Sequence, residues 1–369
     1  MTARVCCHTD IFMSSYMQNQ DLETVRLDDA DSALVVLDQT ELPRRVVYLR
    51  LYTTEEIREA ICSLRVRGAP AIGVAAACGL YLAAKRAAEN YVEFDRFCGN
   101  VQKARERLAS ARPTAVNLSW ALERMSAVLE VCQTKSVAEA VRKLHDTCEE
   151  IRKEDIKVCE AIGEYGLQLL RPGDGVLTHC NAGQLAAVRY GTATAPLYLA
   201  HQRGYHIRVY TEETRPLLQG ARLTAFELHK AGLDVTLVCD NMSAALMRQR
   251  LIQAVFVGCD RVAANGDTAN KIGTAVLAAV AKQYGVPFYV CAPAATVDLR
   301  CASGDVIPIE ERDGAEITEL WYRERMAPEG IRVWNPAFDV TDHSLITAFV
   351  TEKGIVYPPF TDGLAICMK

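Results

Sequence analysis

Two reactive side chains follow short apolar runs in this chain of 369 residues. Val-Leu-Thr-His leads into Cys180, and Val-Phe-Val-Gly-Cys leads into Asp260; small residues and then a helical pattern come after each. Apolar strands that alternate with helices predict a parallel sheet, and ligands bind outside the carboxyl ends of such strands. A thiol and a carboxylate at that edge, with Lys271 further along the chain, would suit proton transfer on an anionic substrate.

Other polar residues compete for these two roles. Asp240 also ends a strand pattern and rivals Asp260, although it could instead cap the helix that follows it. Cys259 precedes Asp260, but alternation along the strand would turn its side chain into the sheet packing. His179 is interpreted as an inward-facing structural side chain, and Asp267 is compatible with either a cap or a substrate contact.

Cations beside tight turns indicate a phosphate site. Arg67 and Arg112 each stand at a turn, rich in Gly, Pro or small residues, that precedes a helix. Backbone N–H groups and the helix dipole at such a point can hold a phosphate. Lys271 supplies a third positive charge, and charge-assisted hydrogen bonds from the three side chains would bracket one phosphate group.

Composition excludes several classes of protein. The net charge of -5 argues against a general nucleic-acid binder, which needs a basic stripe. The 14 cysteines are scattered, without a Cys-x-x-Cys pair or a Cys/His block of metal-ligand spacing, which predicts reduced thiols in the cytoplasm and no metal. No apolar run reaches the ~18 residues of a membrane span, and no secretory signal precedes the chain's first helix pattern. The glycine fingerprints of dinucleotide and nucleoside triphosphate sites are absent, so no cofactor is expected.

The expected fold is α/β in two domains. Residues 1–20 are interpreted as a disordered segment or an extension, and residues 21–170 as a mainly helical domain that begins with a small β element. One of its helices opens at a capping box after Thr53. A turn of sequence Arg-Pro-Gly-Asp-Gly then opens residues 171–369, where strands and helices alternate. This pattern predicts a catalytic domain with a Rossmann-like, doubly wound parallel sheet.

Six segments together resemble the methylthioribose-1-phosphate isomerase family, which is related to the regulatory subunits of the exchange factor of translation initiation. They are RGAPAIG, ARPTAVNLSWA, LTHCNAG, ETRPLLQGARLTAFEL, VGCDRVAANGDTANKIGT and WNPAFDVT, in the expected order from about Leu34 to Phe360. The resemblance implies conversion of an aldose 1-phosphate to the ketose in methionine salvage, without metal or membrane, by a homodimer. The small-residue helices from Val74 and Ala115 and the apolar tail 355–360 offer surfaces for a second copy.

The resemblance also implies the roles of individual residues. Cys180 is the catalytic thiol, Asp260 the proton donor and Asp240 a supporting residue. The substrate-binding positions are Arg67, Gly68, Ala69, Arg112, Gln219, Asn270 and Lys271. Because the phosphate blocks the anomeric oxygen, an acid must protonate the ring oxygen before hydrogen moves from C2 to C1. Asp260 would then need a raised pKa, which burial among Val255, Phe256, Val257 and Val262 could provide. Cys180 could relay the proton or only polarise the substrate while a hydride moves.

Two residues depart from the common family pattern. Gln184 stands where a small residue is usual, and Arg189 where glycine is frequent, just after Cys180. They leave the 5-substituent of the sugar open, since a 5-deoxyribose 1-phosphate isomerase would share every motif. A ribose 1,5-bisphosphate isomerase would need a second cation, for which Arg189 is the candidate. A non-catalytic regulatory subunit would lack the thiol and carboxylate, and both are present here.

Overall fold

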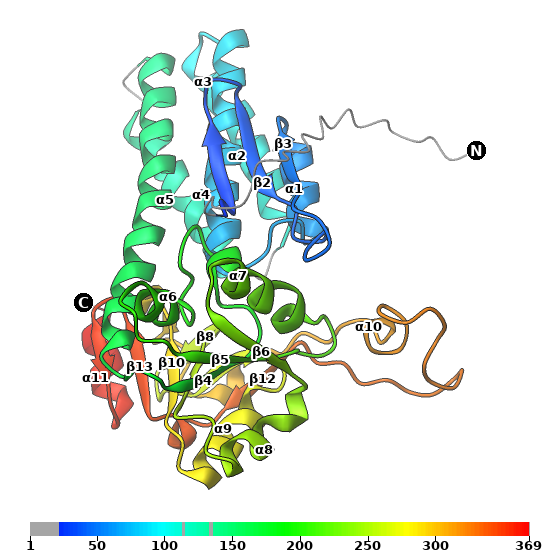
Figure 1. Ribbon diagram of the computed structural model, residues 1–369. Helices are drawn as coiled ribbons and strands as arrows, with labels where there is room; N and C mark the ends of the chain where they lie inside the picture. Colours follow the sequence, from blue (N-terminus) through cyan, green and yellow to red (C-terminus); the bar gives the residue numbers. More distant parts are fainter. Residues whose placement is uncertain (1–21, 113–114, 133–135, 369) are drawn as a thin grey trace. The chain divides into compact units, whose positions relative to one another are not determined.

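The computed structural model describes residues 22–112, 115–132 and 136–368, which form two compact units (Figure 1). The first runs up to Ile156 and includes Leu185–Arg189; the second comprises Lys157–Gln184 and the chain from Tyr190 onward. The segment 1–20 that the sequence singled out lies outside the described residues. The combination of a helical first part with a largely parallel sheet in the second confirms the predicted fold class.

The division between the units falls inside helix α5 (Val137–Leu167), earlier than the boundary predicted after residue 170. Ile162 and Leu167, near the end of α5, are buried in the core of the second unit. Gly163 and Gly166 lie against the side chains of helix α6 (Ala195–Gln202), where an added Cβ would come within 2.8 and 2.3 Å of them. The last part of α5 therefore packs as an element of the second unit.

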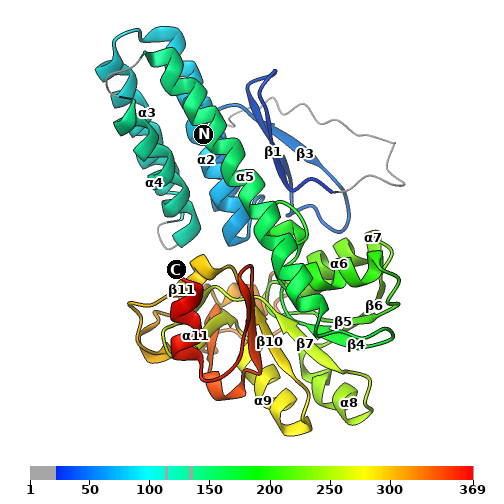
Figure 2. The same ribbon diagram turned by 90° about the vertical axis from the view of Figure 1, so that its left-hand side faces the viewer.

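The first unit combines a small antiparallel sheet with long helices. The strands are β1 (Val25–Asp28), β2 (Ala33–Leu37) and β3 (Tyr48–Leu51); the helices are α1 (Thr54–Cys62), α2 (Ala69–Asn90), α3 (Phe94–Ala109), α4 (Val116–Val131) and most of α5. The predicted capping box is confirmed, because the Thr53 hydroxyl accepts from the Glu56 N–H and the Glu56 carboxylate accepts from the Thr53 N–H. Figure 2 shows α2, α3, α4 and α5 running side by side.

Helix α2 is long and apolar enough to cross a membrane by length and composition alone, contrary to the expectation that no such run exists. Of its most apolar window, 78% is buried within the structure. Its small residues allow close neighbours: Gly79 lies beside Ile57 and Leu108, and a Cβ at Gly73 would come within 3.0 Å of the Asn117 carbonyl. Such a helix, apolar on all sides and buried, is typical of the core of a protein.

The second unit is built on a seven-stranded sheet. Its order is β14 (Gly354–Val356), β13 (Ala348–Thr351), β10 (Phe288–Cys291), β7 (Ala254–Val257), β4 (Gly175–Thr178), β5 (Arg208–Glu212) and β6 (Asp234–Val238). All neighbours pair in parallel except β14 with β13. When the six parallel strands are numbered in chain order, their order across the sheet from β6 to β13 is 3-2-1-4-5-6. This is the strand order of the doubly wound dinucleotide-binding sheets.

Helices cover both faces of this sheet (Figure 1). Helices α6 and α7 (Ala225–Lys230) lie on one face, and α8 (Ser243–Arg248) and α9 (Thr274–Tyr284) on the other. Alternate strand residues enter the two cores: Val176 and Phe256 pack with the α6 side, whereas Leu177, Val255 and Val257 pack with the α8 and α9 side. Both faces of each strand must therefore be apolar, which explains the continuous apolar runs in the sequence.

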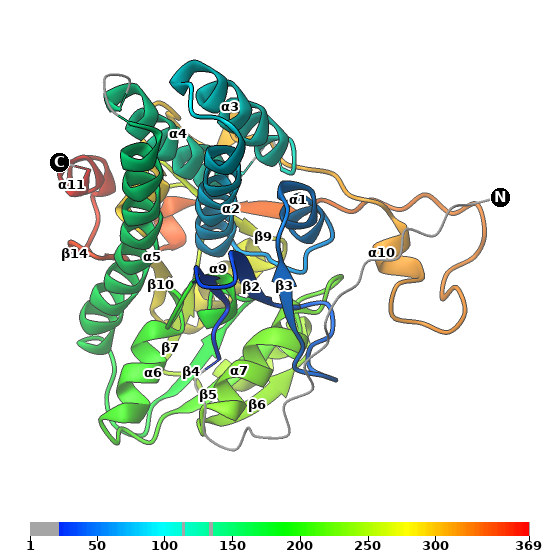
Figure 3. The ribbon, with the colours of Figure 1, turned by 90° about the horizontal axis from the view of Figure 1, so that it is seen from above.

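A smaller sheet and a projecting segment complete the second unit. The sheet has the order β11 (Val297–Asp298), β8 (Arg261–Ala263), β9 (Thr268–Lys271) and β12 (Phe338–Thr341), and the chain ends with helix α11 (Phe360–Cys367). Figure 3 shows the segment between β11 and β12, with the short helix α10 (Ala315–Thr318), extending away from these sheets. Its Trp321 indole donates to the Pro216 carbonyl at 2.7 Å, which joins the segment to the loop after β5.

Candidate active site

The two reactive residues follow adjacent strands at the point where the strand order reverses. Cys180 comes just after β4 and Asp260 just after β7, and these strands are neighbours. The loops also touch, since a Cβ built on Gly258 would lie 2.4 Å from the Ala182 Cβ. In open α/β sheets ligands bind at this position, outside the carboxyl ends of the strands. The expectation that both residues lie at that edge is confirmed.

The backbone of Cys180 has an unusual conformation. Its φ is 62°, in the left-handed region that residues other than glycine rarely adopt. The Cys180 N–H donates to the Thr214 hydroxyl oxygen at 2.9 Å, and the Cys180 carbonyl accepts from the Thr224 hydroxyl at 2.6 Å. The residue itself is buried, with 8% of its surface exposed. A strained, buried cysteine at the end of a strand is a feature that surrounding structure must maintain.

Asp240 holds the loop that carries Thr214. Its two carboxylate oxygens accept from the backbone N–H groups of Thr214 and Arg215, each at 2.7 Å. It does not cap α8, whose N-cap residue is Met242 and has no side-chain cap. The capping alternative from the sequence is therefore wrong, and Asp240 instead fixes a loop beside Cys180.

His179 is an inward-facing side chain, as expected. It is fully buried, its Nδ1 lies 2.6 Å from Oε2 of the buried Glu212, and its Nε2 lies 2.9 Å from the Ile272 carbonyl oxygen. Burial by itself would lower the pKa of His179, but the Glu212 carboxylate raises it above its ordinary value. Burial raises the pKa of Glu212 in turn. The buried contacts of His179 with Glu212 and with the Ile272 carbonyl keep the strand end next to Cys180 in place.

His179, Glu212 and Asp240 lie close enough together to share a metal ion. Both imidazole nitrogens and both Asp240 oxygens, however, already have protein partners. An ion would have to displace those hydrogen bonds. The donor set of this cluster fits a hydrogen-bond network better than a metal centre.

Asp260 differs from the expectation in its burial. Its side chain is exposed, and its N–H pairs with the Ala269 carbonyl at 2.9 Å. The reason is that β7 ends at Val257, so Asp260 lies beyond the buried run and opens the β8–β9 hairpin. The apolar neighbours named from the sequence therefore do not bury it. Cys259 packs against the core as predicted, and burial raises the pKa of its thiol.

Three further residues from the substrate-binding set lie in the second unit. Asn270 is buried and donates to the Thr274 hydroxyl at 3.0 Å. Lys271 is half-buried, and its Nζ donates to the Ala337 carbonyl at 2.9 Å and lies 4.3 Å from the centre of the Phe338 ring. The same loop reaches the residue before Cys180 through the Ile272 carbonyl.

Gln219 is the third of these residues. It is 6% exposed, and it directly precedes a π-helical turn, Gly220–Thr224, a feature that is frequent at functional sites. Among the described residues its Oε1 has no hydrogen-bond partner. A buried carbonyl oxygen without a donor is costly, so this atom is suited to accept a hydrogen bond from a ligand hydroxyl.

The remaining substrate-binding candidates lie in the first unit. Gly68 precedes α2 with a φ of 90°, and a Cβ there would lie 2.3 Å from the Ala186 backbone, so only glycine fits. Ala69 begins α2 and is exposed, whereas Arg67 and Arg112 are half-buried. The predicted site residues thus fall into two groups, one in each unit.

The segment Leu185–Arg189, soon after Cys180, belongs to the first unit. The Gln39 side chain donates to the Leu185 carbonyl at 2.7 Å, and Asp155 accepts from the Val188 N–H at 2.8 Å. Gln184 is half-buried at the start of a single 3-10 turn, rather than on the longer helix expected, and Arg189 is exposed.

Asp267, whose role the sequence left open, is a structural anchor. Its carboxylate accepts from the Asn265 amide, from the Gly304 N–H and from both the N–H and the ring of His343. Burial would raise the pKa of Asp267, but these hydrogen bonds lower it to about 2. A carboxylate with so many protein donors connects the β8–β9 hairpin to its neighbours and has little capacity left for a substrate.

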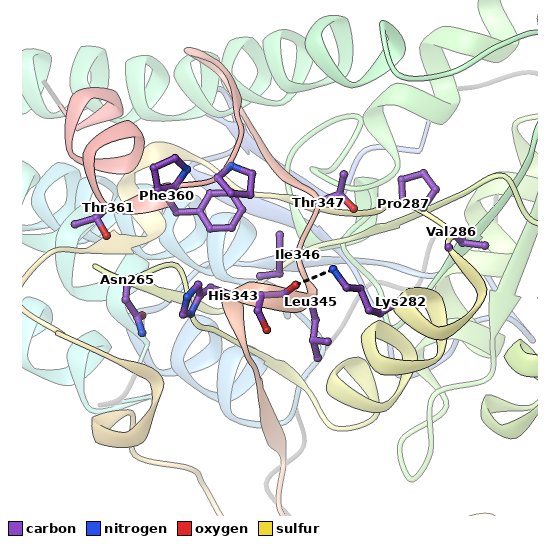
Figure 4. A pocket seen from close by; sticks show the side chains of 14 residues that line it. Asn265, Lys282, Val286, Pro287, His343, Leu345, Ile346, Thr347, Phe360 and Thr361 are labelled. Atoms are coloured by element: carbon purple, nitrogen blue, oxygen red, sulfur yellow. Dashed lines mark hydrogen bonds between the residues drawn. The ribbon is translucent and has the colours of Figure 1, made fainter.

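A cavity of about 900 Å³ lies elsewhere in the second unit (Figure 4). Lys282, His343 and Phe360 are among the residues that line it. It also includes Pro287 and Thr347, which directly precede β10 and β13. These are the amino ends of the parallel strands, whereas Cys180 lies at the carboxyl ends. The cavity is therefore separate from the candidate active site.

Comparison with known proteins agrees with this architecture. Residues 65–358 match the Initiation factor 2 subunit family. Methylthioribose-1-phosphate isomerase of Symbiobacterium thermophilum is 59% identical over 94% of this chain and 96% of its own length. The 5-deoxyribose 1-phosphate isomerase of Petrotoga mobilis is 53% identical over 92% of this chain and 97% of its own. The crystal structure of 5-methylthioribose 1-phosphate isomerase from Pyrococcus horikoshii has a TM-score of 0.89 at 39% identity, covering 96% of this chain and 98% of that one.

The doubly wound sheet, with a thiol and a carboxylate at its switch point, is the site architecture of an α/β enzyme. The chain belongs to the Initiation factor 2 subunit family and is similar to the methylthioribose-1-phosphate isomerases of that family.

Sequence reasoning missed Thr214 and Thr224, the two residues that hold the Cys180 backbone. Both lie in the segment ETRPLLQGARLTAFEL, in which Gln219 is the single residue that the resemblance assigns to the site. Threonine is common in loops and strands, so its residue type carries no signal of this role. Only the contacts across the fold reveal it.

Proposed function

We propose that this protein is an aldose-ketose isomerase that converts 5-methylthioribose 1-phosphate into 5-methylthioribulose 1-phosphate in methionine salvage, using Cys180 and Asp260. The identity of 59% with an isomerase of that name, over nearly the whole of both chains, supports the reaction. The assignment of Cys180 and Asp260 as catalytic residues rests on their position just after the adjacent strands β4 and β7. The reaction takes place on a small sugar phosphate and needs no partner macromolecule.

The chemistry begins with ring opening. Asp260 donates a proton to the ring oxygen, the bond from that oxygen to C1 breaks, and the phosphate stays on the C1 oxygen. Hydrogen then moves from C2 to C1, and the C2 hydroxyl loses its proton to become the ketone. The reaction thus releases one proton for the one that Asp260 donated to the ring oxygen. Cys180 either relays the C2 proton as a thiolate or polarises the substrate during a hydride shift. In either route Asp260 needs to be protonated at the start. Bound substrate that covers the side chain would favour the protonated form, because desolvation raises the pKa of a carboxyl group.

The alternative substrate is 5-deoxyribose 1-phosphate, which would undergo the same reaction. The 53% identity to an isomerase named for that sugar supports it less strongly than the methylthio sugar. Ribose 1,5-bisphosphate is less favoured, since Arg189 is the only new cation singled out for a second phosphate and its side chain is exposed. A purely regulatory role, suggested by the family name, would not require both Cys180 and Asp260.

The direct test of the proposal is an assay of the purified protein with 5-methylthioribose 1-phosphate. Formation of the ketose, followed by phosphorus or carbon NMR, is the expected result. A folded protein that leaves this sugar and 5-deoxyribose 1-phosphate unchanged would favour the non-catalytic role.

Arg67, Arg112 and Lys271 form the proposed phosphate site. The start of α2 beside Gly68 offers backbone N–H groups and the positive end of a helix dipole. Gln219 and Asn270 are proposed to bind the sugar hydroxyls.

Replacing Arg67, Arg112 or Lys271 by methionine should mainly weaken substrate binding. Loss of one hydrogen bond to a charged group costs roughly 1.5–3 kcal/mol, which raises KM by about 10- to 150-fold. Steady-state kinetics with 5-methylthioribose 1-phosphate measures this change in KM. The matched control is Arg96→Met, at an arginine on α3 that is 73% exposed and pairs only locally, with Glu93. An unchanged KM in all three variants would remove the phosphate from this set of residues.

We expect a cytoplasmic homodimer. Helix α2 is buried within its own unit, so the small-residue surface suggested from the sequence is not available there. The projecting segment offers an alternative, because Leu320, Met326, Ile331 and Trp334 are exposed on it. Exposed apolar side chains on a protruding segment are suited to burial against a partner.

Light scattering at micromolar concentration should therefore give twice the chain mass of 40.7 kDa. Trp334→Lys, at a side chain that is 76% exposed, should shift the protein toward the monomer. A wild-type monomer at that concentration would contradict the proposal, and a dimer unaffected by the substitution would place the interface elsewhere.

A further inference from the structure

We infer that Thr214 and Thr224 are positioning residues that together hold Cys180 in its left-handed conformation, and that Asp240 acts on the reaction through Thr214. The inference rests on the proposed function only for what Cys180 does to the substrate. The two threonine hydroxyls and the backbone groups of Cys180 that they contact are termed the threonine clamp.

The threonine clamp contacts both backbone polar groups of Cys180. The Thr214 hydroxyl oxygen accepts from the Cys180 N–H at 2.9 Å, and the Thr224 hydroxyl donates to the Cys180 carbonyl at 2.6 Å. Both threonines are fully buried, so these hydrogen bonds do not compete with bulk water. Neither contact involves the sulfur atom.

The Thr214 side of the clamp is braced by its own loop. Thr214 also has a positive φ, of 66°, and its hydroxyl donates to the Glu212 carbonyl at 3.1 Å. The Asp240 carboxylate accepts from the backbone N–H groups of Thr214 and Arg215. Two consecutive charge-assisted hydrogen bonds hold a strained residue in place, which explains why a carboxylate is needed at the end of β6.

The Thr224 side is braced by a different set of side chains. The Thr224 hydroxyl oxygen accepts from the Asn181 amide at 3.1 Å, and the same amide nitrogen donates to Glu227 at 3.0 Å. Thr224 ends the π-helical turn that follows Gln219. The turn that presents Gln219 and the loop that presents Cys180 are thus joined by one hydroxyl group.

Such a clamp matters because φ determines the direction of the Cα–Cβ bond. A cysteine released from φ 62° would relax to the negative values that side chains prefer, and its thiol would then point elsewhere. A displacement of about 1 Å at a reacting group can cost roughly 100-fold in rate. A valine in place of threonine keeps the shape but removes the hydroxyl, whereas serine keeps the hydroxyl.

The test compares Thr214→Val with Thr214→Ser, and Thr224→Val with Thr224→Ser. Each valine variant should lower kcat by roughly 10- to 100-fold with KM within about threefold of wild type, and each serine variant should retain most of the activity. Asp240→Asn should resemble Thr214→Val, since an amide can accept only one of the two N–H groups. Circular dichroism checks folding, and Thr→Ala replaces any valine variant that does not fold.

A second readout needs no substrate. Iodoacetamide labelling of Cys180, followed by mass spectrometry of its peptide, should be at least about threefold faster in the valine variants, because a released loop exposes the buried thiol more often. The exposed Cys62 serves as the internal control. Valine and serine variants of equal activity, or unchanged labelling of Cys180, would overturn the clamp. A wild-type protein inactive on all pentose 1-phosphates would overturn the proposed function, while the labelling would still test the clamp.

Discussion

Replacing Cys180 by serine, or Asp260 by asparagine, should abolish turnover while the protein stays folded. A serine hydroxyl has nearly the size of the thiol but neither ionises near neutral pH nor polarises the substrate as sulfur does. An asparagine amide occupies the place of the carboxyl group but cannot donate an acidic proton. A positioned acid or base contributes about 10²- to 10⁴-fold, so each variant should lose roughly that factor in kcat.

The measurement is kcat for the isomerisation, with circular dichroism and thermal unfolding as the check on folding. Two matched controls use the same chemical changes at exposed positions outside the site: Cys62→Ser and Asp305→Asn. Both should keep the activity of the wild type. Near-native kcat in Cys180→Ser or Asp260→Asn would show that the role assigned to that residue is wrong.

The exposure of Asp260 sharpens this prediction. Since its side chain is exposed, substrate that covers the site should raise the pKa of the Asp260 carboxyl group through desolvation. Because Asp260 acts as a proton donor, activity falls as the pH rises through its pKa, so the alkaline limb of the kcat profile, which reports the enzyme-substrate complex, should lie at higher pH than that of the kcat/KM profile, which reports the free enzyme. Asp260→Asn should remove this difference from whatever activity is left.

The second large effect concerns the substrate's 5-position. One enzyme should accept both 5-methylthioribose 1-phosphate and 5-deoxyribose 1-phosphate, with kcat/KM values that differ by roughly 10- to 200-fold at most. Both sugars end in an uncharged group, and an apolar pocket distinguishes an additional small apolar group by only about 1–3 kcal/mol. A 5-phosphate should be rejected far more strongly, because an unpaired charge buried in such a pocket costs several kcal/mol.

A side-by-side assay of the three sugars tests this expectation. The methylthio sugar should give the highest kcat/KM, and ribose 1,5-bisphosphate should give little or no turnover. Preference for ribose 1,5-bisphosphate would overturn the hypothesis of a role in methionine salvage and would point to Arg189 as the ligand of the second phosphate. In that case Arg189→Gly should abolish the preference, whereas Gln184→Ala, a change at the other atypical position, should not.

Local sequence patterns were sufficient for much of the fold. The apolar runs before Cys180 and Asp260 predicted buried parallel strands, and β4 and β7 are buried throughout. The capping box at Thr53 is present because it depends only on residues three apart. Strand order follows the doubly wound pattern that alternation of strands and helices predicted. The buried runs and the capping box depend on side-chain type and spacing within a short stretch, whereas the strand order depends on how strands and helices alternate along the whole second unit.

The sequence alone thus determined the class of fold and the family, and it placed Cys180 and Asp260 at strand ends, because these depend on local periodicity and on distinctive motifs. Tertiary structure decided how Cys180 is held, since Thr214 and Thr224 lie 34 and 44 residues away along the chain. It also decided that Asp260 is exposed, because the buried run of β7 stops before it. Hydrogen bonds and burial of this kind arise only when distant segments pack together, and no spacing along the chain specifies them.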